Sequence, residues 1–113
     1  MKLIRLTFAG KGIFRALRDL DDVGMEPWDE QDLYDADRDF EENLKIPDAC
    51  TILNQTKSYF TEKGYERFKE SIETLKFIIN NYLGKKDLVK TEEIEAAEDD
   101  LLYLDEYQAI LAA

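Results

Sequence analysis

The chain's clearest helical pattern is the stretch FTEKGYERFKESIETLKFIINNYLG at residues 60–84. Its apolar residues recur at intervals of three and four, as on one helical face: Tyr65, Phe68, Ile72, Leu75, Ile79 and Tyr82. Thr61 suits an N-cap, and Phe60 and Tyr65 occupy the two positions of a hydrophobic staple. Gly84 stands at the C-cap position. We therefore predict one long central amphipathic helix over residues 65–82.

The N-terminal segment predicts a strand followed by a short helix. Residues 2–8 alternate, with Ile4, Leu6 and Phe8 on one face. Gly10-Lys11-Gly12 interrupts this pattern as a strand-to-helix turn. Apolar residues at helical spacing then predict a short helix that ends at Gly24: Ile13, Phe14, Leu17 and Leu20.

A second helix is predicted over residues 29–45, within an acidic segment at residues 19–45. Its apolar stripe is narrow: Leu33, Ala36, Phe40 and Leu44. Pro27 suits a turn or a first helical turn, and Ile46-Pro47 ends the helix. Acids cover the other faces, and like charges four residues apart weaken a helix, so this one requires packing or a partner.

The remaining segments have strand character. Residues 50–53 and 57–60 read as strands around a turn at residues 54–55. Alternating apolar residues predict a strand at 101–111 after a turn at Asp99-Asp100, with residues 88–90 as a pairing candidate and a helix as the alternative. At 113 residues the chain is predicted to form one domain, 1–113, of the α+β class, with a mainly α fold as the alternative.

The net charge of −11 comes entirely from one part of the chain. Residues 19–42 hold twelve acids and one base, and 12 − 1 = 11, while the other residues hold fourteen of each. The first 18 residues contain five bases and no acid. A localised negative field attracts basic partners and argues against direct nucleic-acid binding through the same face.

Several chemistries are excluded or disfavoured by the residues present. The chain has no histidine, which removes Cys–His and Ser–His nucleophile pairs and ordinary zinc sites. Gly10-Lys11-Gly12 lacks the further residues of a dinucleotide or phosphate-binding loop. Asp35, Asp37 and Asp39 match the start of a calcium loop, but Phe40 stands where that loop needs glycine. We therefore predict no metal site and no cofactor.

The remaining apolar and targeting signals favour a cytoplasmic protein. No apolar run reaches the roughly 18 residues that span a bilayer, and the N-terminus lacks the apolar core of a signal peptide. Cys50 is the lone cysteine, so no internal disulfide forms, and it is interpreted as a small buried hydrophobe. We expect cytoplasmic localisation and no membrane association.

The acidic helix is the predicted binding surface. Asp32, Asp35, Asp39 and Glu42 step along one face, and a rise of ~1.5 Å per residue separates successive carboxylates by roughly 5 Å. This spacing is comparable to that of backbone phosphates, so the helix can occupy a basic groove built for nucleic acid. Trp28 and Tyr34 lie off the apolar stripe as aromatic anchors. The predicted partner-binding residues are Trp28, Asp29, Asp32, Tyr34, Asp35, Asp39 and Glu42.

In its size, its lack of catalytic motifs and its acidic block from Trp28 to Glu42, the chain resembles small phage and mobile-element proteins of the anti-CRISPR, nucleic-acid-mimic type. The resemblance implies a non-enzymatic inhibitor that binds a basic, nucleic-acid-handling protein such as a Cas nuclease, in the host cytoplasm. The alternatives are a structural or assembly protein that oligomerises through residues 65–82, and a solvated acidic face without a partner. A third is a small enzyme resembling ADP-ribosyltransferases, on Arg5, Ser58 and Glu106.

Overall fold

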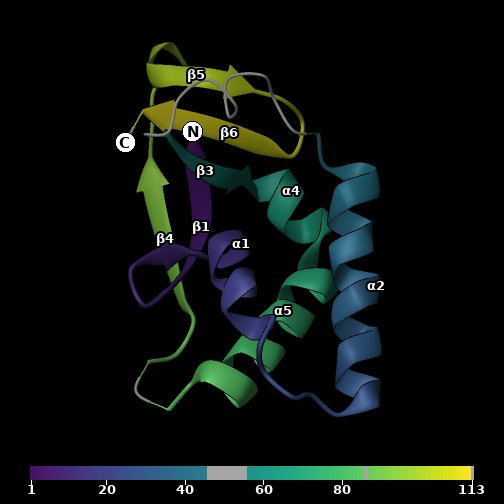
Figure 1. Cartoon of the computed structure of the whole chain (residues 1–113). Helices are drawn as coiled ribbons and strands as arrows, with labels where there is room; N and C mark the ends of the chain where they lie inside the picture. The colour runs from purple at the N-terminus through teal and green to yellow at the C-terminus, as the bar shows by residue number, and fades with distance from the viewer. Residues whose placement is uncertain (46–55, 86, 113) are drawn as a thin grey trace.

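The central strand of the protein is β1 (Lys2–Phe8), which confirms the predicted strand at residues 2–8. The computed structural model describes residues 1–45, 56–85 and 87–112. Over these residues β1 belongs to an antiparallel sheet of six strands in the order β2-β1-β3-β6-β5, with β4 also paired to β1. The other strands are β2 (Lys11–Gly12), β3 (Thr56–Thr61), β4 (Lys90–Glu95), β5 (Leu101–Leu104) and β6 (Gln108–Ala112). The sheet curls, so that β5 and β6 lie across the end of β1 and β4 (Figure 1).

The turn after β1 reverses the chain within two residues. Ala9 and Gly10 both take positive φ angles, +51° and +79°, and β2 then pairs back with Thr7 and Phe8. The predicted short helix follows as α1 (Ile13–Ala16), continued by the 3₁₀ helix η1 (Leu17–Leu20). The interruption predicted at Gly10-Lys11-Gly12 is present, but the turn itself is at Ala9 and Gly10, while Lys11 and Gly12 form a short strand that the glycine pattern did not indicate.

The acidic helix α2 (Pro27–Asn43) begins and ends two residues before the predicted range of 29–45. Pro27 lies in its first turn, where a missing N–H costs nothing. Ala36 and Phe40 are buried and Leu33 and Leu44 are partly buried, which confirms the apolar stripe. The helices α2 and α5 lie side by side (Figure 1), and the stripe belongs to the core that they share.

The predicted long helix is divided into α4 (Glu62–Arg67) and α5 (Lys69–Leu83). The Thr61 hydroxyl accepts the Gly64 N–H at 2.9 Å, which confirms the N-cap. The centroids of the Phe60 and Tyr65 rings lie 6.5 Å apart. The division is at Phe68, where φ is −100° and ψ is 14°. Its ring is fully buried against Phe40 and Tyr107, so the chain departs from ideal helix geometry where this ring enters the core.

Residues 101–111 form strands, as predicted, and not the alternative helix, but the single strand is wrong because β5 and β6 form a hairpin around residues 105–107. The carboxylate of Asp105 accepts the backbone N–H groups of Tyr107 and Gln108, at 2.8 and 2.9 Å, and closes the turn. The predicted pairing of residues 88–90 with this strand is also wrong, since β4 starts at Lys90 and pairs with β1.

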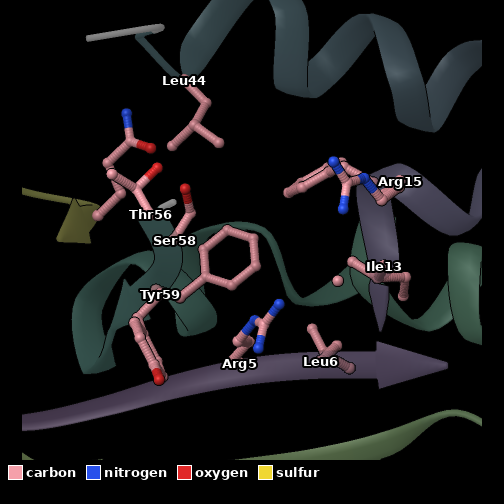
Figure 2. Close-up of a pocket in the computed structure, with 12 residues that line it drawn as sticks. Arg5, Leu6, Ile13, Arg15, Leu44, Thr56, Ser58 and Tyr59 are labelled. Atoms are coloured by element: carbon pink, nitrogen blue, oxygen red, sulfur yellow. The ribbon is translucent and has the colours of Figure 1, made fainter. Parts of the chain in front are cut away.

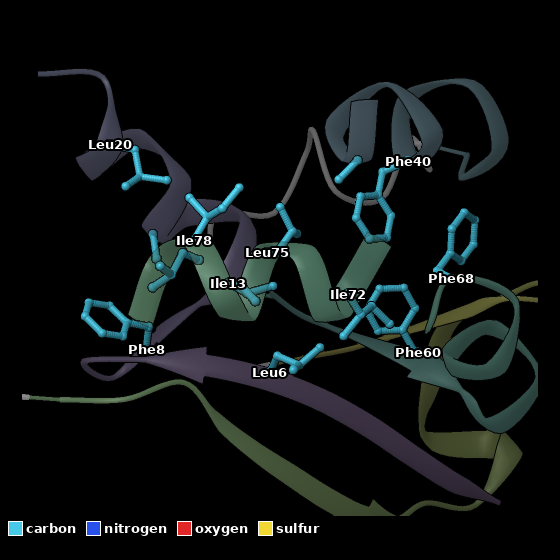
Figure 3. Packing of buried hydrophobic residues seen from close by; sticks show 13 residues of the cluster. Leu6, Phe8, Ile13, Leu20, Phe40, Phe60, Phe68, Ile72, Leu75 and Ile78 are labelled. Atoms are coloured by element: carbon cyan, nitrogen blue, oxygen red, sulfur yellow. The ribbon is translucent and has the colours of Figure 1, made fainter. Parts of the chain in front are cut away.

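The core lies between the sheet and the helices, which makes the architecture α+β, as predicted. Figure 3 shows Leu6, Phe8 and Phe60 of the sheet beneath Ile72, Leu75 and Ile78 of α5. A second, smaller cluster around Leu3, Tyr59 and Ala109 fills the other face of the curled sheet. Cys50 and the strand and turn predicted for residues 50–55 lie outside the described residues. Across the described ranges, no helix is long and apolar enough to cross a membrane.

Candidate partner-binding surface

Two of the predicted binding acids hold α2 against α5. Asp29 is only 8% exposed and accepts the hydroxyl of Tyr82 at 2.5 Å, and this hydrogen bond raises the pKa of Tyr82. Asp39 accepts the hydroxyl of Ser71 at 2.7 Å and forms an ion pair with Arg67 at 3.4 Å. Both carboxylates therefore have intramolecular partners, which supply the packing that this acidic helix requires.

The other predicted acids lie on an exposed side of α2 together with Trp28. A helix turns by about 100° per residue, which brings Trp28, Asp32 and Asp35 onto one side with Glu42. Asp39 lies on the same side, at its border with α4 and α5. Trp28 is 65% exposed, and Asp32, Asp35 and Glu42 are exposed. We call Trp28, Asp32, Asp35 and Glu42 the acidic face.

Tyr34 is exposed as predicted, but it does not belong to this face. It is 62% exposed and lies about 120° around the helix from Trp28. There it borders a groove of about 540 Å³ between η1 and α2. The acids at the groove come from α2 and from the loop that precedes it: Asp21, Glu30 and Asp37. These three were missed as a group, although the helical spacing of Glu30, Tyr34 and Asp37 could have indicated them.

The negative charge of the segment is only partly compensated. Among the described residues, three of its twelve acids form ion pairs: Asp19 with Lys11, Asp39 with Arg67, and Glu42 with Arg38. The Arg38–Glu42 pair is exposed at 2.8 Å, and the hydrogen bond to Glu42 raises the pKa of Arg38. The four-residue spacing of this pair could have been read from the sequence. Nine acids, 12 − 3, form no ion pair with any residue in the described part of the chain.

The calcium-like spacing falls within α2 and does not gather its carboxylates. Asp35 and Asp39 share one side of the helix, whereas Asp37 points about 160° away from Asp39. Asp35 instead accepts the side-chain amide of Gln31 at 3.0 Å. No group of three metal-ligating side chains occurs in residues 1–45, 56–85 and 87–112.

The stripe proposed for oligomerisation is part of the core. Phe68, Ile72, Leu75 and Ile79 are buried, so these side chains offer no surface to a second copy. The predicted intervals are correct, and the side chains at these positions face the sheet and α2 of the same chain.

The three residues of the enzyme alternative do not meet. Arg5 and Ser58 line one pocket, but Glu106 forms an ion pair with Lys63 and does not line that pocket. The hydrogen bond to Glu106 raises the pKa of Lys63. The carboxylate that acid–base work would require is thus directed elsewhere.

The candidate surface is therefore one exposed side of α2, on which an aromatic ring stands among carboxylates. The helix is held in place by Asp29 from another face and by Asp39 where this side meets α4 and α5. No family model, no curated protein and no solved structure matches the chain.

Proposed function

We propose that this chain is a non-enzymatic binding protein whose acidic face occupies a basic, nucleic-acid-binding surface of a partner protein. The observation that carries the proposal is the exposure of Trp28 beside Asp32 and Asp35. Tryptophan is enriched at protein interfaces, and its ring supplies apolar area among charges that steer the encounter.

The spacing of the carboxylates supports a groove built for phosphates as the target. Asp32, Asp35 and Glu42 are exposed on a helix whose other side is packed against α5, so their relative positions are held by the fold. Binding through such contacts releases counter-ions from both surfaces, and the affinity falls as salt rises.

A guide-loaded Cas nuclease is the most concrete partner, because the chain resembles small acidic inhibitors of that type. Its nucleic-acid channel is positively charged and contacts the backbone rather than the base sequence. In this proposal the chain competes with DNA for that channel.

The test is a competition assay in which the chain displaces a labelled DNA duplex from a guide-loaded Cas nuclease. The variant carries Asp32→Asn, Asp35→Asn and Glu42→Gln, and leaves Asp39 in place because it bonds Ser71. The control carries Glu98→Gln, Asp99→Asn and Asp100→Asn, which remove the same charge from the exposed η2 helix (Glu98–Asp100).

We expect the control to compete like the unchanged chain and the α2 variant to lose competition. Competition by the unchanged chain should also weaken between about 50 and 200 mM salt. Equal loss in both variants would show that only net charge matters. Full competition by the α2 variant would exclude this face as the binding surface.

A further inference from the structure

A pocket opens where the sheet divides between β1 and β3. These strands pair only at Leu3–Thr61 and Ile4–Phe60. Farther along, the same edge of β1 pairs with β2, while the rest of β3 pairs with β6. The pocket of about 380 Å³ lies in this division, below Leu44 at the end of α2 (Figure 2).

The polar lining of this pocket has the opposite charge to the molecule as a whole. Arg5 of β1 and Arg15 of α1 both line it, and no acid does among the described residues. Thr56 and Ser58 of β3 add hydroxyl groups on the far side of the opening, as Figure 2 shows. In a chain with 26 acids and 15 bases, two arginines and no acid thus line this pocket among the residues that the structure describes.

The Arg5 side chain does not pair with the acid that lies opposite it in the sheet. Glu92 is its cross-strand partner on β4, an arrangement that favours an ion pair. Within the described part of the chain, neither Arg5 nor Arg15 forms an ion pair. The guanidinium of Arg5 instead lies beside β2, where a Cβ on Gly12 would stand 3.2 Å from its Nη2. Glycine at this position leaves room for the guanidinium at the pocket.

The apolar lining gives the pocket a second kind of surface. Leu6, Ile13 and Phe60 come from the core, and Phe14 stands at the border, 39% exposed. The centroids of the Phe14 and Phe60 rings lie 6.3 Å apart. A cavity of this size, with an apolar wall and a few convergent polar groups, suits a small organic ligand.

We propose that this pocket binds a small organic anion, a phosphate ester of an aromatic or apolar alcohol. The phosphate lies between Arg5 and Arg15 and accepts hydrogen bonds from both guanidinium groups and from the Ser58 hydroxyl. Guanidinium groups form paired, charge-assisted hydrogen bonds with phosphate oxygens. The apolar part of the ligand lies against Phe14 and Phe60.

The test is calorimetric titration of the full chain with phenyl phosphate, with inorganic phosphate and phenol as the two partial ligands. We expect saturable binding of phenyl phosphate that is tighter than either partial ligand. Arg5→Gln and Arg15→Gln should each weaken it by about tenfold. Arg18→Gln removes the same charge from η1, outside the pocket. This control should change the affinity for phenyl phosphate by less than about twofold.

A second variant changes the position of the Arg5 guanidinium and keeps the charge of the pocket. Gly12→Ala keeps both arginines and suits the local backbone (φ −62°, ψ 149°), but its methyl group would stand 3.2 Å from Nη2 of Arg5, so that the guanidinium has to shift by a few tenths of an ångström. It should weaken phenyl phosphate binding while the melting temperature and circular dichroism stay unchanged. The proposal is overturned if phenyl phosphate does not bind at concentrations on the order of 10 mM, or if it binds equally well to Arg5→Gln and Arg15→Gln.

Discussion

Gly64 lies where α4 passes the turn between β5 and β6, and the absence of a side chain permits this contact. A Cβ at this position would stand 1.9 Å from the carbonyl oxygen of Tyr107. The same oxygen accepts a hydrogen bond from the Thr61 N–H at 3.0 Å, which fixes its position next to Gly64. The contact joins the N-cap of the central helix to the C-terminal hairpin.

Gly64→Ala should therefore lower the free energy of unfolding by about 2 kcal/mol, because the backbone has to move to admit the methyl group. Urea denaturation measures this change. Gly24→Ala is the matched control, since nothing lies within 4 Å of a Cβ at Gly24. Equal stability of the two variants would show that the α4 contact is not tight.

Asp105 is the residue whose charge stabilises the hairpin. Partial burial by itself would raise the pKa of its carboxyl group. Hydrogen bonds from the Tyr103 hydroxyl and from the N–H groups of Tyr107 and Gln108 outweigh burial and lower that pKa below its ordinary value.

Because its folded-state pKa is lowered, Asp105 stabilises the fold above its unfolded pKa of about 4, and this contribution is lost as pH falls through the folded-state value. Asp105→Asn should cost about 1–2 kcal/mol at neutral pH. The difference between variant and unchanged chain should shrink below pH ~4 in urea denaturation series. A difference that is constant with pH would exclude the charged hydrogen bonds as its cause.

At the scale of the element, α2 has acids at both ends although only one end favours them. Glu30 lies in its first turn, where a helix dipole stabilises negative charge. Glu41 and Glu42 lie in its last turn, which contains no base. The C-terminal end of α2 is therefore the unfavourable one.

Glu41→Lys should raise the free energy of unfolding by about 0.5 kcal/mol, and Glu30→Lys should raise it less or lower it. Both side chains are exposed, and both substitutions change the net charge equally. The pair of variants thus separates the dipole from relief of the overall negative charge. Equal thermal stability would show that only net charge acts.

At the scale of the whole molecule, the charges form regions of opposite sign. The segment with eleven excess negatives, residues 19–42, covers the end of η1, the following loop and nearly all of α2, while Arg5 and Arg15 line the pocket at the divided sheet. Self-repulsion among the uncompensated acids opposes folding, and salt screens it.

The melting temperature should therefore rise when sodium chloride increases from about 10 mM to about 150 mM, over which the Debye length falls from roughly 30 to 8 Å. The η2 control variant described above should show a smaller rise, since it carries three fewer negative charges. A melting temperature that falls with salt would mean that the ion pairs outweigh the repulsion.

Local patterns predicted much of the fold because they depend on near neighbours. The alternation at residues 2–8 and the Thr61 cap both proved correct. The turn at Asp105 was missed because residues 101–111 keep an apolar alternation across it, and only the hydrogen bonds to this carboxylate reveal the reversal.

The sequence by itself determined the acidic segment, the apolar stripes and the strand β1, since charge and periodicity are properties of the chain in order. The tertiary structure decided which acids of α2 remain exposed. Asp29 meets Tyr82, 53 residues away, and Asp39 meets Ser71, 32 residues away. The tertiary structure also decided that β1 and β3 separate from each other and leave a pocket lined by two arginines. Such contacts join residues far apart in the chain, which no local pattern specifies.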